Sequence, residues 1–524
     1  MNEPRKLRGL ALHEWLWRWR YALFAAVLGH FILAHYFVLG LISWDGFGHR
    51  IPPVVELVKH GSFGLEKYTN WALVGFRPFV ELVNAPFLYL FGLDGLYFGF
   101  ALTLFPFCAV ALFLFTREAT RDRNAGFYAS ATYVLVPMVN SQVFSGYVDW
   151  AITGLLALFL YTLLAIGRDE QQPRSVDYAK VTLATFLYTM ARQQAPYLAV
   201  FFVGVLACTF FVERRGLRLS LKRPRVLGWM LAAFVVGLAP AAIAQLLNYL
   251  RYGSPIYPYQ FKLLGVAIGD GWTLEFLAYL GGLEEYSLSG FFRTSVAAWL
   301  VPSTWPNTFF DSRHFGGGLF FITALVTLPL TLKAANRRTL ILLAAFVVAS
   351  IIGKDFWLPR YAYTVMLSIC LLNGIAFSTL IEREKRWAFY ALTGVLALHV
   401  LRPEWDVFRI RAGDAYPRLN ASKSSLFLKG NFDFWLYPDV GAQLVIARTP
   451  VNSFGLLLYG RKLTNTVVGS VLTVDARCES LRPLLRETPG ALVVDDDNLT
   501  KDCPRTCAIS DGRCLAYRLE PESP

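Results

Sequence analysis

Apolar runs long enough to cross a lipid bilayer recur along most of this sequence, and short loops rich in Lys and Arg separate them. A helix needs about 20 apolar residues to cross the hydrocarbon core of a membrane. The chain has 524 residues, of which 55% are hydrophobic, and a soluble enzyme of this length does not bury so large an apolar fraction. We therefore expect an α-helical polytopic membrane protein.

We interpret the sequence as about eleven membrane spans followed by a polar domain. The spans lie near residues 21–43, 96–116, 126–140, 150–167, 180–193, 196–212, 226–248, 317–333, 339–353, 360–381 and 388–402. The first run is long enough to cross and lacks an A-x-A cleavage site, so we expect a span there and not a cleaved signal peptide. The chain then divides into a membrane domain, residues 1–402, and a C-terminal domain, residues 403–524.

The positions of Lys and Arg orient these spans, because short cytoplasmic loops carry an excess of positive charge. Basic loops lie near residues 117–123, 168–180, 214–225, 333–338 and 383–386. All of them are cytoplasmic, together with the basic N-terminus, if the segment 77–92 lies flat at the membrane interface and does not cross. We thus expect an inner (plasma) membrane protein whose C-terminal domain is extracytoplasmic. The net charge of +13 follows from this loop pattern and does not indicate nucleic-acid binding.

The C-terminal domain has strand-like runs at residues 443–447 and 491–494 between polar turns, which favours a small α/β domain. It also contains a cluster of four cysteines, Cys478, Cys503, Cys507 and Cys514. Clustered cysteines outside the cytosol favour disulfides. A zinc site is the alternative, but the cluster lacks paired C-x2-C spacing and a nearby His.

Two acidic residues lie where predicted spans meet the outer face. Asp45 follows the first span together with His49 and Arg50, and Asp149 stands at the outer end of a later span. Charges at such positions are costly unless they are paired or used. Convergence of the two acids would create a pocket in which one accepts a proton and the other positions a partner or metal. The alternative is that Asp45 pairs with Arg50 or caps a helix expected over residues 52–60.

Basic and aromatic residues are expected at the same membrane level. The cations are Arg192, Lys354 and Arg360, and Tyr361 follows the last of them. Fixed cations beside acids suit a phosphate-bearing substrate with a hydroxyl acceptor, although basic side chains at span ends also anchor helices at the interface. The outer loop 249–316 adds Tyr257 and Tyr259, which fit either a substrate pocket or an interfacial aromatic belt.

This arrangement resembles the C class of glycosyltransferases (the GT-C fold), particularly the branch that contains protein O-mannosyltransferases and the lipid A aminoarabinose transferase. The matching stretches are Asp45 followed by Arg50 and His60-Gly61-Ser62-Phe63, then Asp149, then Tyr252-Gly253-Ser254-Pro255-Ile256-Tyr257-Pro258, and finally Pro359-Arg360-Tyr361. The resemblance covers roughly residues 21–381. Many relatives have Asp-Glu where this chain has Asp45-Gly46, so a metal role at Asp45 is not supported by the resemblance.

The resemblance implies a membrane enzyme that takes a sugar from a polyprenyl-phosphate donor at the outer face and transfers it, with inversion, to an acceptor hydroxyl. Asp45 would act as general base, and Arg360, with Arg192 and Lys354, would stabilise the departing phosphate. The acceptor, whether glycan, lipid or protein, is not set by the sequence. No motif requires a cofactor, although Asp45 and Asp149 would hold a divalent ion if they converge. A lipid-linked sugar flippase and a polysaccharide polymerase are the alternatives.

Overall fold

The structure is a computed structural model of the chain. It describes residues 22, 29, 50–63, 78–96, 98–143, 148–166, 173–212, 224–256, 261–263, 266–268, 287, 289–290, 293, 299, 318–353, 362–385, 387–397, 439–447, 459, 462–471, 478–494, 503–510 and 514–519. The description below concerns these residues.

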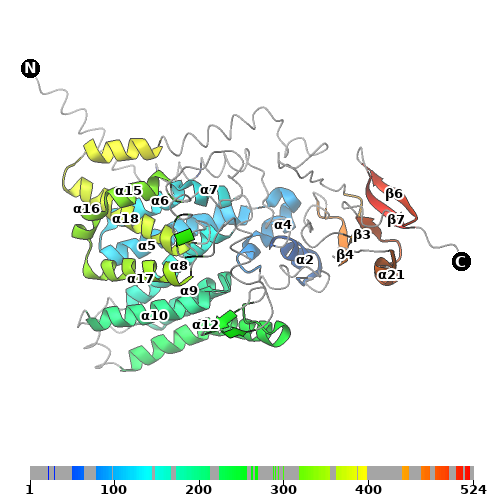
Figure 1. Ribbon diagram of the computed structural model, residues 1–524, viewed down its shortest axis with the longest axis horizontal. Helices are drawn as coiled ribbons and strands as arrows, with labels where there is room; N and C mark the ends of the chain where they lie inside the picture. Colours follow the sequence, from blue (N-terminus) through cyan, green and yellow to red (C-terminus); the bar gives the residue numbers. More distant parts are fainter. Residues whose placement is uncertain are drawn as a thin grey trace, which may run out of the picture.

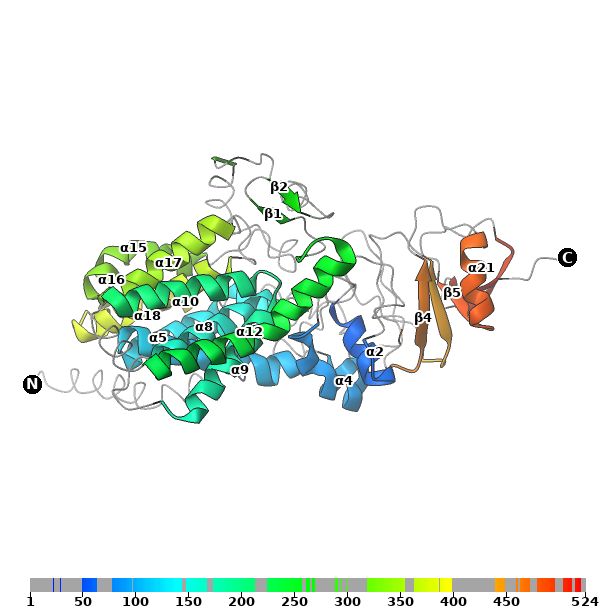
Figure 2. The same ribbon diagram turned by 90° about the horizontal axis from the view of Figure 1, so that it is seen from below.

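The described part of the chain consists of a long helical bundle, a short helical segment beside it and a small sheet at the far end (Figures 1 and 2). The short segment comprises α2 (Pro52–His60), η3 (Glu81–Asn84), α4 (Ala85–Phe91) and η4 (Gly92–Gly95). The bundle comprises η5 (Gly99–Leu104), α5 (Phe105–Thr120), α6 (Arg123–Leu135), α7 (Pro137–Val143), α8 (Asp149–Ile166), α9 (Ser175–Ala191), α10 (Ala195–Val212), α12 (Pro224–Tyr252), α15 (Leu319–Val326), α16 (Leu328–Ala334), α17 (Arg337–Gly353), α18 (Tyr363–Glu382) and a helix over 387–397.

Small residues let the central helices of the bundle approach closely. Helix α8 packs on α5, and α18 packs on α6. A Cβ added at Gly154 of α8 would overlap the side chain of Cys108 on α5, and one added at Gly374 of α18 would overlap the backbone of Ala125 on α6. Small residues at helix interfaces are typical of membrane bundles, where packing rather than the hydrophobic effect holds helices together.

Four described helices are long and apolar enough to cross a membrane. They span Gly99–Thr120, Asp149–Ile166, Arg225–Tyr252 and Tyr363–Glu382. Every span predicted between residues 96 and 402 overlaps a helix, but some are interrupted. In the predicted span 126–140, Val136 adopts an extended conformation before Pro137, as the residue preceding a proline usually does. The count of eleven therefore stays a prediction, and so does the first span, which lies outside the described residues except for Ala22 and Gly29.

The segment 77–92 was predicted to lie flat at the interface. Its only α-helix, α4, has seven residues and so extends about 10 Å, too short to cross a bilayer. Tyr89, Leu90 and Phe91 at its C-terminal end are exposed. A short helix with exposed apolar residues agrees with the interfacial interpretation.

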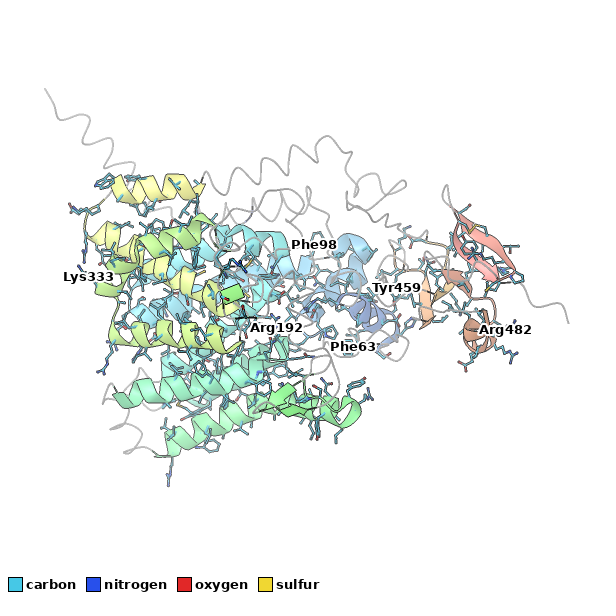
Figure 3. All side chains as sticks on the ribbon, in the orientation of Figure 1. Phe63, Phe98, Arg192, Lys333, Tyr459 and Arg482 are labelled. Carbon is cyan, nitrogen blue, oxygen red and sulfur yellow. A yellow bond between two sulfur atoms is a disulfide. The ribbon has the colours of Figure 1, made fainter. Side chains whose placement is uncertain are left out.

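Several basic loops lie at one end of the bundle. The Nδ2 of Asn336 donates hydrogen bonds to the carbonyl oxygens of Ala119 and Thr120 at 2.9 and 3.2 Å. The hydroxyl of Ser378, near the end of α18, donates to Asp122. The loops near 117–123 and 333–338 and the end of α18 are therefore neighbours. Figure 3 shows Lys333 at this end and Arg192 nearer to the C-terminal sheet.

The C-terminal domain contains a five-stranded mixed sheet with the order β4-β3-β5-β7-β6. Its strands are β3 (Gln443–Ala447), β4 (Thr466–Val471), β5 (Leu492–Val494), β6 (Arg505–Ser510) and β7 (Cys514–Leu519), and helix α21 (Cys478–Glu487) accompanies them. Strand β3 runs parallel to β4 and β5, while β7 is antiparallel to β5 and β6. A two-stranded hairpin, β1 (Phe261–Leu263) and β2 (Val266–Ile268), lies apart from this sheet.

Disulfides are present in this domain, as predicted. Cys507 and Cys514 are bonded across the β6–β7 hairpin, and Cys503 is also disulfide-bonded. The side chain of Cys478 lies outside the described residues. The disulfides, and not the alternative zinc site, therefore account for the described part of the cysteine cluster.

Candidate functional site

The predicted acid Asp149 is the first residue of helix α8, and the residue beside it anchors this end of the helix. The backbone N–H of Trp150 donates to Oε1 of Gln142 at 3.2 Å, and its carbonyl accepts from the hydroxyl of Tyr133 at 2.8 Å. The Trp150 ring packs edge-on against Phe100. Because Trp150 is completely buried, the start of α8 and the Asp149 side chain have a defined position.

Arg192 lies in the break between α9 and α10. Its backbone is extended, with φ −155° and ψ 151°, so the helix ends and the guanidinium points back toward α8. Its Nη1 donates to Oδ1 of Asp149 at 2.7 Å, and the two side chains are 17% and 1% exposed. A charge-assisted hydrogen bond this deeply buried is among the stronger polar contacts in a protein.

The second carboxylate oxygen of Asp149, Oδ2, is buried and has no hydrogen-bond partner among the described residues. Buried polar atoms are nearly always satisfied, and exceptions are concentrated where a ligand, an ion or a water binds. Asp149 therefore presents one oxygen to Arg192 and keeps a second that can accept a hydrogen bond from a substrate hydroxyl.

A second ion pair lies beside the first. The Nη1 of Arg50 donates to Oε1 of Glu81 at 2.8 Å, and their side chains are 12% and 2% exposed. Glu81 belongs to η3. The side-chain Nδ2 of Asn84 donates to the backbone carbonyl of Glu81 at 3.3 Å, and the Oδ1 of Asn84 accepts from the backbone N–H of Phe100. Gly99 permits this close packing, because a Cβ there would overlap the backbone of Val83.

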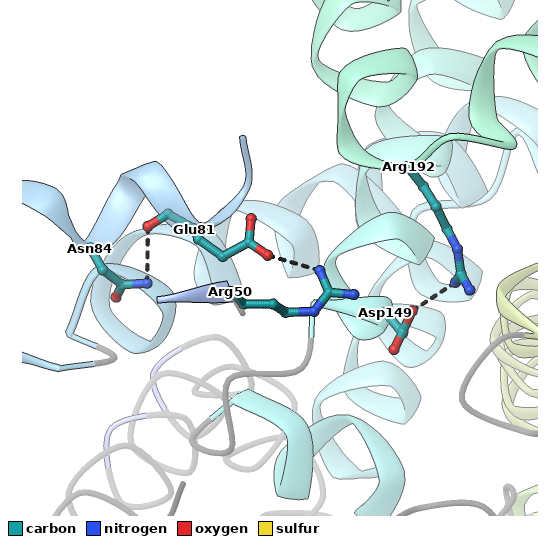
Figure 4. A network of polar contacts seen from close by, with 5 residues as sticks. All are labelled: Arg50, Glu81, Asn84, Asp149 and Arg192. Atoms are coloured by element: carbon teal, nitrogen blue, oxygen red, sulfur yellow. Dashed lines mark hydrogen bonds and ion pairs between the residues drawn. The ribbon is translucent and has the colours of Figure 1, made fainter. Parts of the chain in front are cut away.

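Figure 4 shows the two ion pairs together, with the Arg50 side chain between Glu81 and Asp149. Burial raises the pKa of the Glu81 carboxyl above its ordinary value of 4.5, Arg50 opposes this shift, and the nearby charge of Asp149 adds to it. The two carboxylates are therefore close enough to influence each other. Two acids and two arginines from four separate segments form one buried polar cluster.

Glu81 was not among the residues singled out in the sequence. The available signal was a single acid within the segment 79–91, in which Asn84 is the only other side chain with an amide or charge, and a lone acid in such a segment is expensive unless it is paired. Asp149 and Arg192 were expected at the same membrane level, and the structure adds a direct ion pair between them. The other predicted site residues, Asp45, His49, Lys354, Arg360, Tyr361, Tyr257 and Tyr259, lie outside the described residues.

Metal ligands do not group in the described part of the chain. No set of three or more His, Cys, Asp or Glu side chains is close enough there to hold an ion. Asp45 lies outside this part, so its predicted convergence with Asp149 is not tested.

Comparisons with known proteins show the fold. No protein-family model and no curated protein sequence matches the chain. Among solved structures, ArnT from Cupriavidus metallidurans bound to undecaprenyl phosphate is similar over 95% of this chain and 97% of that one, with a TM-score of 0.51 and 13% identity. The same protein in the apo state gives a TM-score of 0.51 at 15% identity, covering 97% of this chain and 98% of that one.

The oligosaccharyltransferase of Archaeoglobus fulgidus in the apo form covers 91% of this chain and 70% of that one, at 14% identity and a TM-score of 0.47. The alignment with ArnT extends over nearly the full length of both chains. The chain therefore has the GT-C fold of membrane glycosyltransferases, as its motifs predicted.

Proposed function

We propose that this protein is an integral membrane glycosyltransferase that moves a sugar from a polyprenyl-phosphate donor to an acceptor hydroxyl, with inversion. The observation that supports this most is the buried Asp149–Arg192 pair, 2.7 Å between Nη1 and Oδ1, within a bundle that has the GT-C fold. The fold is shared with ArnT, which has been crystallised with undecaprenyl phosphate. A fold alone does not define a reaction, so the proposal depends on the cluster.

Within this proposal Asp149 positions the acceptor or donor sugar through its unsatisfied Oδ2. Asp45 is the general base: it takes the proton of the acceptor hydroxyl, whose oxygen attacks the anomeric carbon while the bond from that carbon to the phosphate oxygen breaks. The polyprenyl phosphate departs with the bonding electrons. One displacement inverts the configuration at the anomeric carbon.

Departure of the phosphate requires fixed positive charge nearby. In this proposal Arg360 and Lys354 supply it, with Tyr361 as a hydrogen-bond donor, and Arg192 contributes from its position beside Asp149. His49, Arg50, Tyr257 and Tyr259 line the substrate pocket. Arg50 also joins the pocket to Glu81 through their 2.8 Å ion pair.

The proposed orientation places the cluster at the extracytoplasmic face. Arg192, which is ion-paired with Asp149, lies nearer to the C-terminal sheet, whereas Lys333 lies at the opposite end of the bundle (Figure 3). The basic loops near 117–123 and 333–338 lie together at that opposite end. Basic loops are retained in the cytoplasm. The inner membrane would hold the protein with its C-terminal domain and disulfides outside the cytosol.

A flippase and a polymerase are distinguished from a transferase by their products. Purified protein in proteoliposomes would be incubated with radiolabelled polyprenyl-phosphate sugars and a mixture of glycan, lipid and peptide acceptors. The proposal predicts free polyprenyl phosphate and an acceptor that carries one added sugar. Donor that crosses the bilayer intact would indicate a flippase, and a ladder of long products would indicate a polymerase.

A further inference from the structure

Helix α2 lies between the helical bundle and the C-terminal sheet (Figures 1 and 2). It begins immediately after Ile51, which is buried, and ends at Gly61 with a left-handed conformation, φ 72°. Glu56, in the middle of this helix, is completely buried. An acidic side chain is almost never fully buried unless it is paired, so the partners of Glu56 identify the part of the protein against which α2 packs.

Those partners include a residue from the C-terminal domain. The hydroxyl of Tyr459 donates to Oε1 of Glu56, and Nε2 of His60 lies 3.9 Å from Oε2. Tyr459 is itself completely buried, and Figure 3 shows it between α2 and the sheet. The contact joins residues 403 positions apart in the sequence.

Lys59 makes a second connection to the same domain. Its Nζ donates to the backbone carbonyl oxygens of Leu463 and Asn465, and it lies 5.8 Å from the centre of the Tyr459 ring. A lysine that donates to two carbonyls and faces an aromatic ring is held in one position. Glu56 and Lys59 of α2 thus both bind the loop of the C-terminal domain that runs from Tyr459 to Asn465.

That loop is attached firmly to the sheet by Asn465. Its side-chain oxygen accepts from the backbone N–H groups of Val440 and Ala442 at 3.3 and 3.1 Å, and its own N–H donates to the carbonyl of Tyr459 at 3.1 Å. Asn465 directly precedes strand β4 and is completely buried. Asn465 therefore ties Tyr459 to the residues that precede β3 and β4.

The other end of α2 carries a member of the buried cluster. Arg50 immediately precedes Ile51, whose carbonyl accepts the N–H groups of Val54 and Val55 at 2.9 and 3.1 Å. Arg50 in turn holds Glu81 through the 2.8 Å ion pair. One residue separates Arg50 from the first turn of a helix, so a displacement of α2 displaces the guanidinium.

We infer that Glu56, Lys59 and Tyr459 are positioning residues: they hold α2 against the C-terminal domain and so set the position of Arg50, and with it Glu81, in the buried cluster. The effect on sugar transfer rests on the proposed function. The structural part of the inference, that the C-terminal domain orders the cluster through α2, is independent of the proposed function.

The test uses full-length protein in lipid nanodiscs and four substitutions. Lys59→Met removes the ammonium, Tyr459→Phe removes the hydroxyl, and Glu56→Gln keeps an acceptor for Tyr459. Lys462→Met is the matched control, because Lys462 lies in the same loop and is exposed. Hydrogen–deuterium exchange would be followed in peptides covering 50–63, 78–96 and 149–166.

Lys59→Met and Tyr459→Phe are expected to increase exchange in both 50–63 and 78–96, while 149–166 is unchanged. Glu56→Gln and Lys462→Met are expected to resemble the wild type. Increased exchange confined to the C-terminal domain, with 78–96 unchanged, would overturn the inference, as would equal effects of Lys462→Met. Loss of protection throughout the bundle would also overturn it, because it would show that these residues support the whole fold.

Turnover provides a second measurement on the same samples. Misplacement of a pocket residue by about 1 Å can lower a rate about a hundredfold, and we expect Lys59→Met and Tyr459→Phe to reduce kcat, normalised to folded protein, at least about tenfold. Glu56→Gln should retain wild-type kcat. Absence of turnover by wild-type protein with every donor would contradict the proposed function, and the exchange data would still decide the inference.

Discussion

Arg192 donates through Nη1 to Oδ1 of Asp149 over 2.7 Å, and the other oxygen of that carboxylate is buried without a partner among the described residues. The pair joins the start of α8 to the break between α9 and α10. Its energetic weight follows from burial: taking two charges out of water is costly, so each depends on the other for compensation.

Arg192→Met is expected to destabilise the protein by about 3–5 kcal/mol, because it leaves the Asp149 carboxylate buried without its cation. Thermal unfolding in nanodiscs would measure the loss. Asp149→Asn should cost less, since an amide oxygen still accepts from Arg192.

The double variant Asp149→Asn/Arg192→Met supplies the control. Removing both charges should recover part of the stability that Arg192→Met loses, with a coupling energy of about 0.5–3 kcal/mol. Strictly additive effects would contradict a direct interaction between the two side chains.

Glu81 predicts a pH dependence of stability. Burial raises the pKa of its carboxyl above 4.5 in the folded protein. As pH rises past 4.5 the unfolded chain releases this proton before the folded protein does, so the folded state loses stability until its own, higher pKa is passed. Glu81→Gln removes this titration and keeps an acceptor for Arg50.

The thermal midpoint of the wild type should therefore fall relative to that of Glu81→Gln as pH increases from 5 to 8. Unfolding curves of both proteins across this range would measure the difference. A difference that is independent of pH, or one that grows in favour of the wild type, would contradict the raised pKa.

The glycine contacts between helices predict a contrast between two alanine substitutions. Gly154→Ala should destabilise the bundle and lower the yield of folded protein, because the new methyl group overlaps Cys108. Gly204→Ala in α10 is the matched control, since among the described residues no atom beyond its own helix backbone lies within 4 Å of the position of its added Cβ. It should be neutral or slightly stabilising, as alanine favours a helix by about 1 kcal/mol over glycine. Size-exclusion profiles and thermal midpoints would compare the two, and equal losses would contradict the close α5–α8 packing.

The Cys507–Cys514 disulfide closes a loop with a sequence separation of 7. Loop-closure entropy for so short a loop predicts that Cys507→Ser/Cys514→Ser lowers the stability of the C-terminal domain by about 2–3 kcal/mol. Proteolysis of this domain with and without reductant would measure the change. Unchanged protease resistance of the double variant would contradict a stabilising role for the bond.

The positions of individual helices and strands were predicted well from the sequence, because neighbouring residues such as Pro and Gly set where they begin and end. The helix expected over residues 52–60 is α2, whose limits are set by Pro52 at its start and by Gly61, with φ 72°, at its end. The strand expected at 443–447 is β3. Span limits were less accurate: the span predicted over 317–333 is interrupted at Thr327, where α15 ends before α16 begins.

Contacts between distant residues could not be predicted from one sequence. Asp149 and Arg192 were expected at the same membrane level, but their direct pairing depends on how α8 packs against α9. The contact of Tyr459 with Glu56 depends on the docking of a separate domain. Glu81 stood out only as a lone acid in its segment, and the sequence does not show that Arg50 and Asp149 lie close to it from other segments.

The proposal that acids at the outer face carry out sugar transfer is tested most directly by turnover of the donor. Wild-type, Asp45→Asn and Asp149→Asn proteins in lipid would be incubated with a panel of radiolabelled polyprenyl-phosphate sugars, and release of free polyprenyl phosphate would be measured. We predict release by the wild type from at least one donor and a decrease of about a hundredfold or more in both variants. No release from any donor by intact wild-type protein, or full release by both variants, would contradict the account.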